Sequence, residues 1–169
     1  MHSLDFRSEL TEIHYAHHKE RPPGEWLQFS AAPGRLARLD LRVGGVPTQA
    51  VIDTGAHQTI GNERLRKALL LRGRTMQDAD IVGVTMDVTH AKRIPIHALA
   101  FGSVIVRNVA ICFGELPVFE HWRLNGEPAL LLGLDVIEKF EAFEIDSSQG
   151  KLHLCPRSGE SIHGQKQRS

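Results

Sequence analysis

The stretch Val51-Ile52-Asp53-Thr54-Gly55-Ala56 places a carboxylate directly after an apolar run. Such a run is typical of a buried strand, and a carboxylate there is costly unless it is hydrogen-bonded or put to use. The Thr54 hydroxyl can lock the loop, and Gly55 lets another backbone approach closely because it has no side chain. Two interpretations follow: a functional carboxylate, or an Asx turn in which Asp53 only accepts hydrogen bonds from backbone amides.

The residues before this stretch predict a β-hairpin. Leu39, Leu41 and Val43 alternate with polar residues, which is the period of a half-buried strand. Gly44-Gly45 supplies a two-residue turn because both glycines accept positive φ. Residues 46–52 then return as the partner strand and lead into the acidic loop.

The residues after the loop predict one helix and several strands. Leu65, Ala68 and Leu69 have helical spacing after Asn62, which is a suitable cap, and Gly73 follows as a stop. Further strands are expected at residues 81–88, 94–101, 104–113, 143–146 and 151–155, with a polar turn at residues 89–92 and a loop at residues 114–128.

A continuous apolar run, Ala129-Leu130-Leu131-Leu132, ends at Gly133. An uninterrupted run of this kind predicts a strand buried on both faces. A short helix is expected at residues 134–140, with Asp135 in its first turn, where the helix dipole favours a carboxylate. The short strands and frequent turns predict an all-β fold, a small closed β-barrel with one short helix near the C-terminal part.

The two ends of the chain are more polar than its middle. The length of 169 residues suffices for one domain with a buried core. We expect a loosely ordered N-terminal extension over residues 1–34, a single domain over residues 35–155, and a disordered tail over residues 156–169, where apolar residues are scarce.

Composition and charge argue against several classes of partner. The 20 Lys and Arg residues balance 20 Asp and Glu residues, so no global attraction to nucleic acid or to an anionic membrane surface is expected. No apolar run approaches the roughly 18 residues of a membrane span. The N-terminal stretch lacks the apolar core of a signal peptide, which predicts a cytoplasmic protein. The ten histidines and two cysteines form no metal-binding motif, so neither a metal nor another cofactor is expected.

The Asp-Thr-Gly-Ala loop and the later run Leu130-Leu131-Leu132-Gly133-Leu134-Asp135-Val136-Ile137 together resemble the retropepsin-like aspartic protease family, in its bacterial single-lobe form. The resemblance implies a β-barrel of the acid protease type over most of the chain. The site residues that it implies are Asp53 as the catalytic carboxylate, Thr54 as the brace of the loop across a dimer, Gly55 and Ala56 as the floor, and Leu132 and Gly133 in the strand that passes the loop.

The resemblance also implies a flap hairpin over the active site. Its tip is expected at Gly83, Val84, Thr85 and Met86, which would then contact substrate. Retroviral relatives carry several glycines in this hairpin, whereas this stretch has only Gly83. Residues 89–92 are an alternative position for the tip.

The implied chemistry is hydrolysis of peptide bonds by a water molecule held between two carboxylates that share one proton. The sequence contains a single Asp-Thr-Gly, so the second carboxylate has to come from another copy of Asp53. A homodimer acting on a peptide or protein substrate is therefore expected. The alternative is a catalytically idle dimeric module that keeps the barrel as a platform for binding or assembly.

Overall fold

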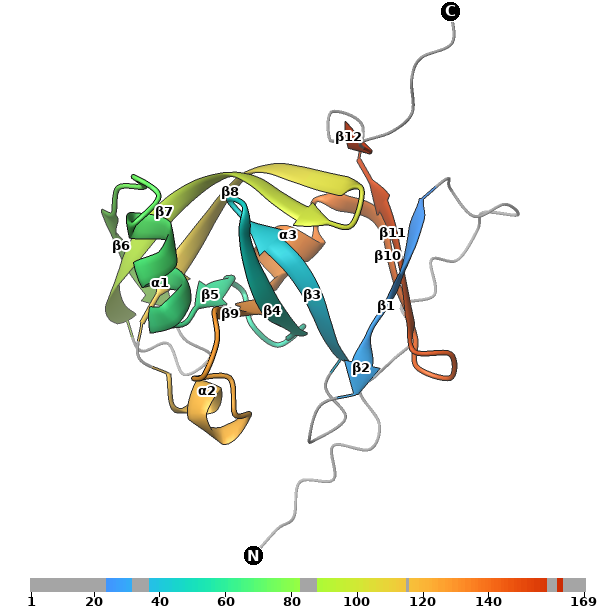
Figure 1. The fold of residues 1–169 in the computed structure, drawn as a ribbon, viewed down its shortest axis with the longest axis horizontal. Coiled ribbons are helices and arrows are strands. Elements are labelled where there is room, and N and C mark those ends of the chain that lie inside the picture. Colours follow the sequence, from blue (N-terminus) through green and yellow to red (C-terminus); the bar gives the residue numbers. More distant parts are fainter. Residues whose placement is uncertain (1–23, 32–36, 83–87, 115, 158–160, 163–169) are drawn as a thin grey trace, which may run out of the picture.

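A computed structural model describes residues 24–31, 37–82, 88–114, 116–157 and 161–162 of the chain (Figure 1). The strands are β1 (Glu25–Gln28), β2 (Ser30–Ala31), β3 (Ala37–Val43), β4 (Val46–Ile52), β5 (Ile60–Gly61), β6 (Gln77–Val82), β7 (Val88–Phe101), β8 (Val104–Phe113), β9 (Ala129–Leu132), β10 (Phe140–Asp146), β11 (Lys151–Pro156) and β12 (Ser161–Ile162). The helices are α1 (Glu63–Leu70), α2 (Pro117–His121) and α3 (Leu134–Ile137). Among these residues, no helix combines the length and the apolar character that crossing a bilayer requires.

Six strands close into a barrel. Neighbouring strands follow the order β8-β5-β9-β4-β3-β7, and β7 pairs with β8 to complete the ring. Closure lets the strands of the ring find hydrogen-bonding partners on both sides. The main apolar core fills the interior, and α1 contributes Leu65 and Leu69 to it. The predicted all-β closed barrel is confirmed.

The strands β3 and β4 form the predicted hairpin. Val43 pairs with Val46 across the turn, and Gly44 and Gly45 adopt φ angles of 54° and 85°. These angles lie in the left-handed region that glycine adopts without steric cost, so the pair of glycines fixes the register of the hairpin. Alternate residues of β3 are buried, as the period of the sequence predicts.

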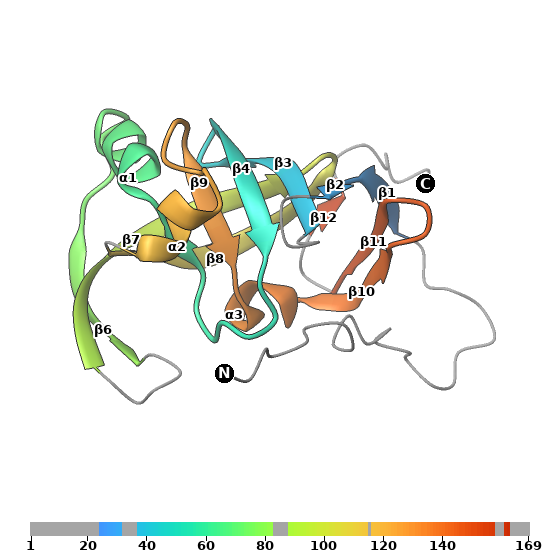
Figure 2. The same ribbon diagram turned by 90° about the horizontal axis from the view of Figure 1, so that it is seen from below.

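The strand β9 lies between β4 and β5 in the sheet. Figure 2 shows β9 beside β4. It runs parallel to β4, where Ile52 is paired with Leu132, and antiparallel to β5, where Ile60 is paired with Leu131. All four residues of β9 are buried, which confirms the prediction from its uninterrupted apolar run. The chain therefore leaves β4, passes around the end of β9 as residues 53–59, and returns on the other side of it.

The helix α1 begins where the sequence predicts. The Asn62 side chain caps it, because its Oδ1 accepts a hydrogen bond from Leu65 N at 2.9 Å. The buried residues Leu65 and Leu69 are one turn apart and face the core. Gly73, with a φ of 75°, follows the end of the helix.

The hairpin of β6 and β7 differs from the prediction. Pairing runs from Gln77 with Arg93 to Val82 with Val88, so residues 89–92 lie within a strand. The prediction of a turn at residues 89–92 is therefore wrong. The polar residues there continue the strand because β6 supplies a backbone partner for each of them. Beyond them β7 continues without a break to Phe101, so the strand expected at residues 94–101 begins at Val88, and the strand before it, β6, ends at Val82.

The helices in the second half of the chain also differ from the prediction. The helix α2 lies in the segment 114–128, where only a loop was expected. Its buried Phe119 packs in a small apolar cluster with Val51 of β4 and Leu131 of β9. The helix α3 spans one turn rather than two because the chain enters β10 at Phe140.

The strands β1, β11 and β10 form a separate three-stranded sheet. Glu25 on β1 is paired with Leu154 on β11, and its carboxylate accepts a hydrogen bond from Ser103 N at 2.9 Å, in the turn between β7 and β8. Residues 25–28 and 30–31 are thus strands within the segment expected to be loosely ordered, and β12 pairs with β8 inside the expected disordered tail. Such short strands have too few residues to show a period, so only their partners define them.

Candidate active site

The backbone around Asp53 fixes one of its two carboxylate oxygens. Asp53 N donates to Leu132 O at 3.0 Å, and Asp53 O accepts from Ala56 N at 3.1 Å. The side-chain Oδ1 accepts from Gly55 N at 3.1 Å, which is the bond of an Asx turn. Within the part of the chain that the structure describes, Oδ2 accepts no hydrogen bond. The half-buried carboxylate thus has one oriented oxygen and one available oxygen, beside the exposed residues Thr54 and Gly55.

The loop of residues 53–59, hereafter the Asp53 loop, caps the N-terminus of α3. Leu134 N donates to Ala56 O at 2.9 Å, and Asp135 N donates to His57 O at 3.2 Å. The first amides of a helix have no partner within the helix, and α3 has no side-chain cap. The loop carbonyls supply those partners, so the loop and the helix fix each other's position. Figure 2 shows the loop running beside α3.

Thr59 joins the end of the loop to β9 and α3. The side chain is fully buried. Its Oγ1 donates to Asp135 Oδ1 at 2.7 Å and accepts from Gly133 N at 3.0 Å. Asp135 lies in the first turn of α3, as expected, but its carboxylate also holds this hydroxyl. Sequence reasoning assigned neither residue to the site, because the two lie 76 positions apart and no local pattern links them.

Gly133 occupies a position that leaves no room for a side chain. A Cβ built there would lie 2.5 Å from Gln58 C and 2.6 Å from Gln58 O, both backbone atoms of the Asp53 loop. Its φ of −91° suits any residue, so close approach rather than backbone conformation requires glycine. The loop can pass over the end of β9 at this distance only because position 133 has no Cβ.

A buried thiol lies behind the loop. Cys112 on β8 donates its backbone N–H to Thr59 O at 3.1 Å, and its Sγ lies 3.5 Å from Gln58 Oε1. Burial raises the pKa of the Cys112 thiol, and the nearby Arg93 guanidinium opposes this in part. Cys112 and Cys155 are both buried and free.

The structure brings six of the predicted site residues together. Four of them, Asp53, Thr54, Gly55 and Ala56, form the first half of the loop, and Leu132 and Gly133 end the strand beside it. Their roles stay a prediction. The predicted flap residues Gly83, Val84, Thr85 and Met86 lie outside the described residues. The pairing of Val82 with Val88 shows that β6 and β7 are connected through them, which rules out a tip at residues 89–92.

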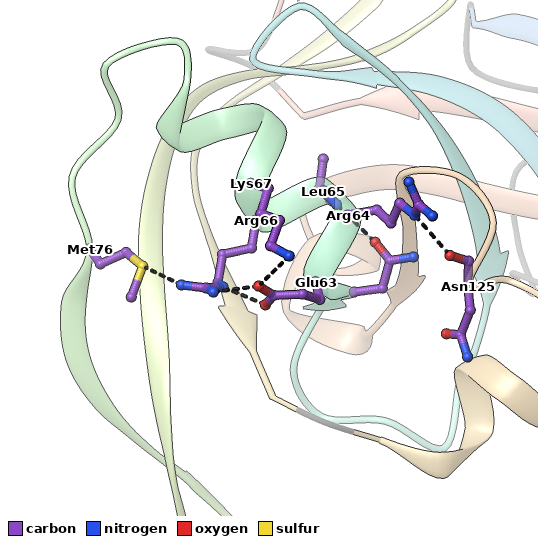
Figure 3. Close-up of polar contacts among 8 residues, drawn as sticks. Glu63, Arg64, Leu65, Arg66, Lys67, Met76 and Asn125 are labelled. Carbon is purple, nitrogen blue, oxygen red and sulfur yellow. Dashed lines mark hydrogen bonds and ion pairs between the residues drawn. The ribbon is translucent and has the colours of Figure 1, made fainter.

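A cavity of about 560 Å³ lies at the opposite end of β9 from Asp53. Figure 3 shows its charged side, where Arg66 on α1 forms an ion pair with Glu63 and contacts Met76 Sδ at 3.5 Å. The hydrogen bond from Arg66 lowers the pKa of Glu63, and burial opposes this in part. Arg64 Nε donates to Asn125 O at 3.2 Å. These charges already have partners, and the cavity is separate from the candidate site.

Metal-ligating side chains do not gather in the described part of the chain. No group of three or more His, Cys, Asp and Glu residues there is arranged to hold a metal ion. The candidate site therefore consists of a carboxylate, backbone amides and carbonyls, and the pair of Thr59 and Asp135.

The chain has the fold of a known protease. It is similar to a retropepsin-like aspartic protease from Rickettsia conorii, with 17% sequence identity and a TM-score of 0.54, covering 78% of this chain and 91% of that one. It also matches the retroviral protease-like domain of Ddi1 from Leishmania major, with 16% identity and a TM-score of 0.45, covering 73% of this chain and 97% of that one. Among curated proteins, none matches the chain significantly.

The sequence model of a family described as aspartyl protease matches residues 39–136, more than half of the chain. The matched span begins in β3 and ends in α3, and it includes both Asp53 and Gly133. The chain therefore belongs to the aspartyl protease family and has a retropepsin-like fold.

Proposed function

We propose that the chain is an aspartic endopeptidase that hydrolyses peptide bonds between the Asp53 carboxylates of two subunits, with water as the nucleophile. The geometry of Asp53 carries this proposal. Its carboxylate is half-buried, one oxygen is oriented by Gly55 N at 3.1 Å, and the neighbouring Thr54 and Gly55 are exposed. An oriented carboxylate at an open surface suits acid–base chemistry. Membership of the aspartyl protease family supports the same reaction.

In the proposed reaction, the two carboxylates hold one proton between them because both cannot be ionised at close range. The ionised carboxylate takes a proton from water as the water oxygen attacks the carbonyl carbon of the peptide bond. The protonated carboxylate gives its proton to the carbonyl oxygen. The tetrahedral diol then collapses. The first carboxyl gives the proton that it took from water to the amide nitrogen, the second carboxylate takes a proton from one hydroxyl of the diol, and the C–N bond breaks to leave a carboxylic acid and an amine. The Gly55 amide keeps one carboxylate oriented throughout, which lowers the entropic cost of reaching the reactive geometry.

The second carboxylate is proposed to come from a second copy of the chain. The sequence has one Asp-Thr-Gly, so a single chain supplies half of the pair. Two features support self-association. The exposed tip of the Asp53 loop can meet its twin across a two-fold axis. Within the described residues, β10 has β11 on one side only, and an open strand edge can pair with another chain.

Replacing Asp53 by Asn tests the function. The amide keeps the shape of the side chain and an oxygen for the Gly55 bond, but it cannot act as the base. Cleavage of a peptide mixture by Asp53→Asn should be undetectable by mass spectrometry, while circular dichroism and sedimentation remain those of the wild type. Asp40→Asn, an exposed change on β3, is the control and should remain active. Equal cleavage by wild type and Asp53→Asn would leave the idle binding or assembly module as the better description.

A further inference from the structure

We propose that Thr59 and Asp135 are positioning residues that hold the Asp53 loop in its reactive geometry. The inference rests on the proposed function, because positioning matters only if Asp53 reacts. Neither side chain is hydrogen-bonded to the Asp53 carboxylate, so their effect has to pass through the backbone. Three observations carry the inference: the bonding of the Thr59 hydroxyl, the path from that hydroxyl to Asp53, and the bonds on the other side of the loop.

The Thr59 hydroxyl uses its only proton and one of its lone pairs. It donates to Asp135 Oδ1 at 2.7 Å and accepts from Gly133 N at 3.0 Å. A hydroxyl has one proton and two acceptor sites, so no water is required to satisfy it. Because Thr59 is fully buried, removing the hydroxyl would leave the Gly133 amide without its acceptor inside the protein. The bond to a carboxylate is charge-assisted, which makes it shorter and stronger than a bond between neutral groups.

The path from this hydroxyl to Asp53 is short. Gly133 follows Leu132, and Leu132 O accepts the hydrogen bond of Asp53 N at 3.0 Å. A shift of Gly133 therefore moves the carbonyl that fixes the backbone of the proposed catalyst. The absence of a Cβ at position 133 allows the Gln58 backbone to approach closely, so packing also transmits such a shift to the loop.

Asp135 acts on the other side of the loop. Its backbone N–H donates to His57 O at 3.2 Å, while its side chain holds Thr59 at the end of the same loop. Asp135 thus restrains the loop at two points through one residue of α3. The Asp53 loop is fixed at its start by Leu132, in its middle by α3, and at its end by Thr59, so the carboxylate has little freedom to depart from its orientation.

The test compares Thr59→Val, which keeps the shape and loses the hydroxyl, with Thr59→Ser, which keeps the hydroxyl. Well below the midpoint of thermal unfolding, Thr59→Val should lower kcat about 10- to 100-fold, with KM almost unchanged, because misplacement of a reacting group slows the chemical step. Thr59→Ser should restore most of kcat. Thr48→Val is the matched control, since Thr48 is also buried, lies at the far end of β4 and donates to Val46 O at 2.9 Å. It should lower stability and leave kcat unchanged.

A second pair of variants covers the case in which Thr59→Val does not fold. Asp135→Asn keeps an oxygen that can accept the Thr59 bond, whereas Asp135→Ala removes it, so kcat should fall further in Asp135→Ala. The inference is overturned if Thr59→Val or Asp135→Ala retains wild-type kcat, or if Thr48→Val loses as much kcat as Thr59→Val. The kcat comparison requires that the wild type cleaves peptide and that Asp53→Asn does not. If that condition fails, the proposed function itself is wrong, and the positioning role with it.

Discussion

Single buried polar side chains join the elements of this barrel. Asn62 satisfies its whole hydrogen-bonding capacity. Its Oδ1 accepts from Leu65 N at 2.9 Å and Ala129 N at 3.1 Å, and its Nδ2 donates to Leu124 O and Glu127 O, both at 2.8 Å. One amide thus starts α1, positions the beginning of β9 and holds the loop that precedes it. Sequence reasoning identified the cap, which is local, but not the three contacts to residues far along the chain.

Asn62→Ala should therefore cost far more than the loss of a helix cap. Removal takes a partner from two backbone carbonyls and two backbone amides; three of these hydrogen bonds are buried, and the one to Glu127 O is partly buried. We expect the free energy of unfolding to fall by about 2–4 kcal/mol, which combines the usual cost of a lost cap with that of unsatisfied buried groups. Urea denaturation measures this change. The control is Asn125→Ala, which replaces an exposed side chain in the same region and should change the free energy of unfolding by less than about 0.5 kcal/mol. Equal losses in the two variants would contradict the role of Asn62.

The shared proton of the proposed carboxylate pair has a consequence for pH. The pair works only while it holds one proton, so peptide cleavage should be greatest on the acidic side of neutral and decline as the last proton leaves. Initial rates measured with one peptide across the pH range, together with circular dichroism at each pH, test this. A rate that keeps rising into the alkaline range while the fold is intact would be incompatible with a carboxylate pair as the catalyst.

At the scale of elements, the end of β9 decides where the candidate site lies. The strand ends at Leu132, the Asp53 loop crosses at Gly133, and α3 starts immediately afterwards at Leu134. The contact is close because the loop backbone occupies the space that a side chain would need. Changes at this crossing should therefore affect the fold and the site together.

Gly133→Ala should be strongly unfavourable. The new Cβ would lie 2.5 Å from Gln58 C, so the loop backbone would have to move. We expect a loss of about 1–3 kcal/mol in stability, as for other overpacked positions, together with a loss of peptide cleavage. Gly126→Ala is the matched control, because no atom lies within 4 Å of a Cβ built there and its φ is not positive. Thermal unfolding and cleavage rates of both variants give the comparison. If Gly133→Ala were as stable and as active as Gly126→Ala, the close contact between position 133 and the Gln58 backbone would be disproved.

Elements with a local signal were predictable, and those defined by distant partners were not. The alternation in β3, the paired glycines after it and the cap of α1 all act within a few residues, and each gave the correct element. By contrast, α2 depends on Phe119 packing against Val51 and Leu131, which lie elsewhere in the chain. The same distinction holds in the site. Asp53 and Gly133 each lie in a short motif, and the family resemblance that the two motifs carry singled them out, whereas Thr59 and Asp135 meet only because β9 passes between β4 and β5.

At the scale of the whole molecule, the two ends of the described chain are tied to the barrel. The strand β1 pairs with β11, Glu25 is hydrogen-bonded to Ser103 in the turn between β7 and β8, and β12 pairs with β8. This places the three-stranded sheet against the barrel and leaves the outer side of β10 without a partner within the described residues. In the proposed dimer, the exposed tip of the Asp53 loop would lie at the contact with the second copy.

Mixing subunits distinguishes a shared site from one contained in a single chain. If each active site needs two Asp53 carboxylates, equal amounts of wild type and Asp53→Asn allowed to exchange should give about one quarter of the activity of wild type at the same total concentration, because only that share of dimers has two wild-type chains. A site within one chain would give half. Mixing wild type with Asp40→Asn is the control and should preserve activity. Cleavage rates before and after exchange provide the measurement.

The position of β9 between β4 and β5 also sets the order of events while the protein is being made. The strands β4 and β5 are neighbours in the chain, yet they are joined only through a segment, Ala129–Leu132, that leaves the ribosome much later. Pairing between distant segments forms slowly because a long loop has to close first. Until β9 is in place, Asp53 has no Leu132 carbonyl to bind and Thr59 has no Gly133 amide. A growing chain therefore lacks these two anchors of the Asp53 loop, and the proposed peptidase activity cannot begin until synthesis has passed β9.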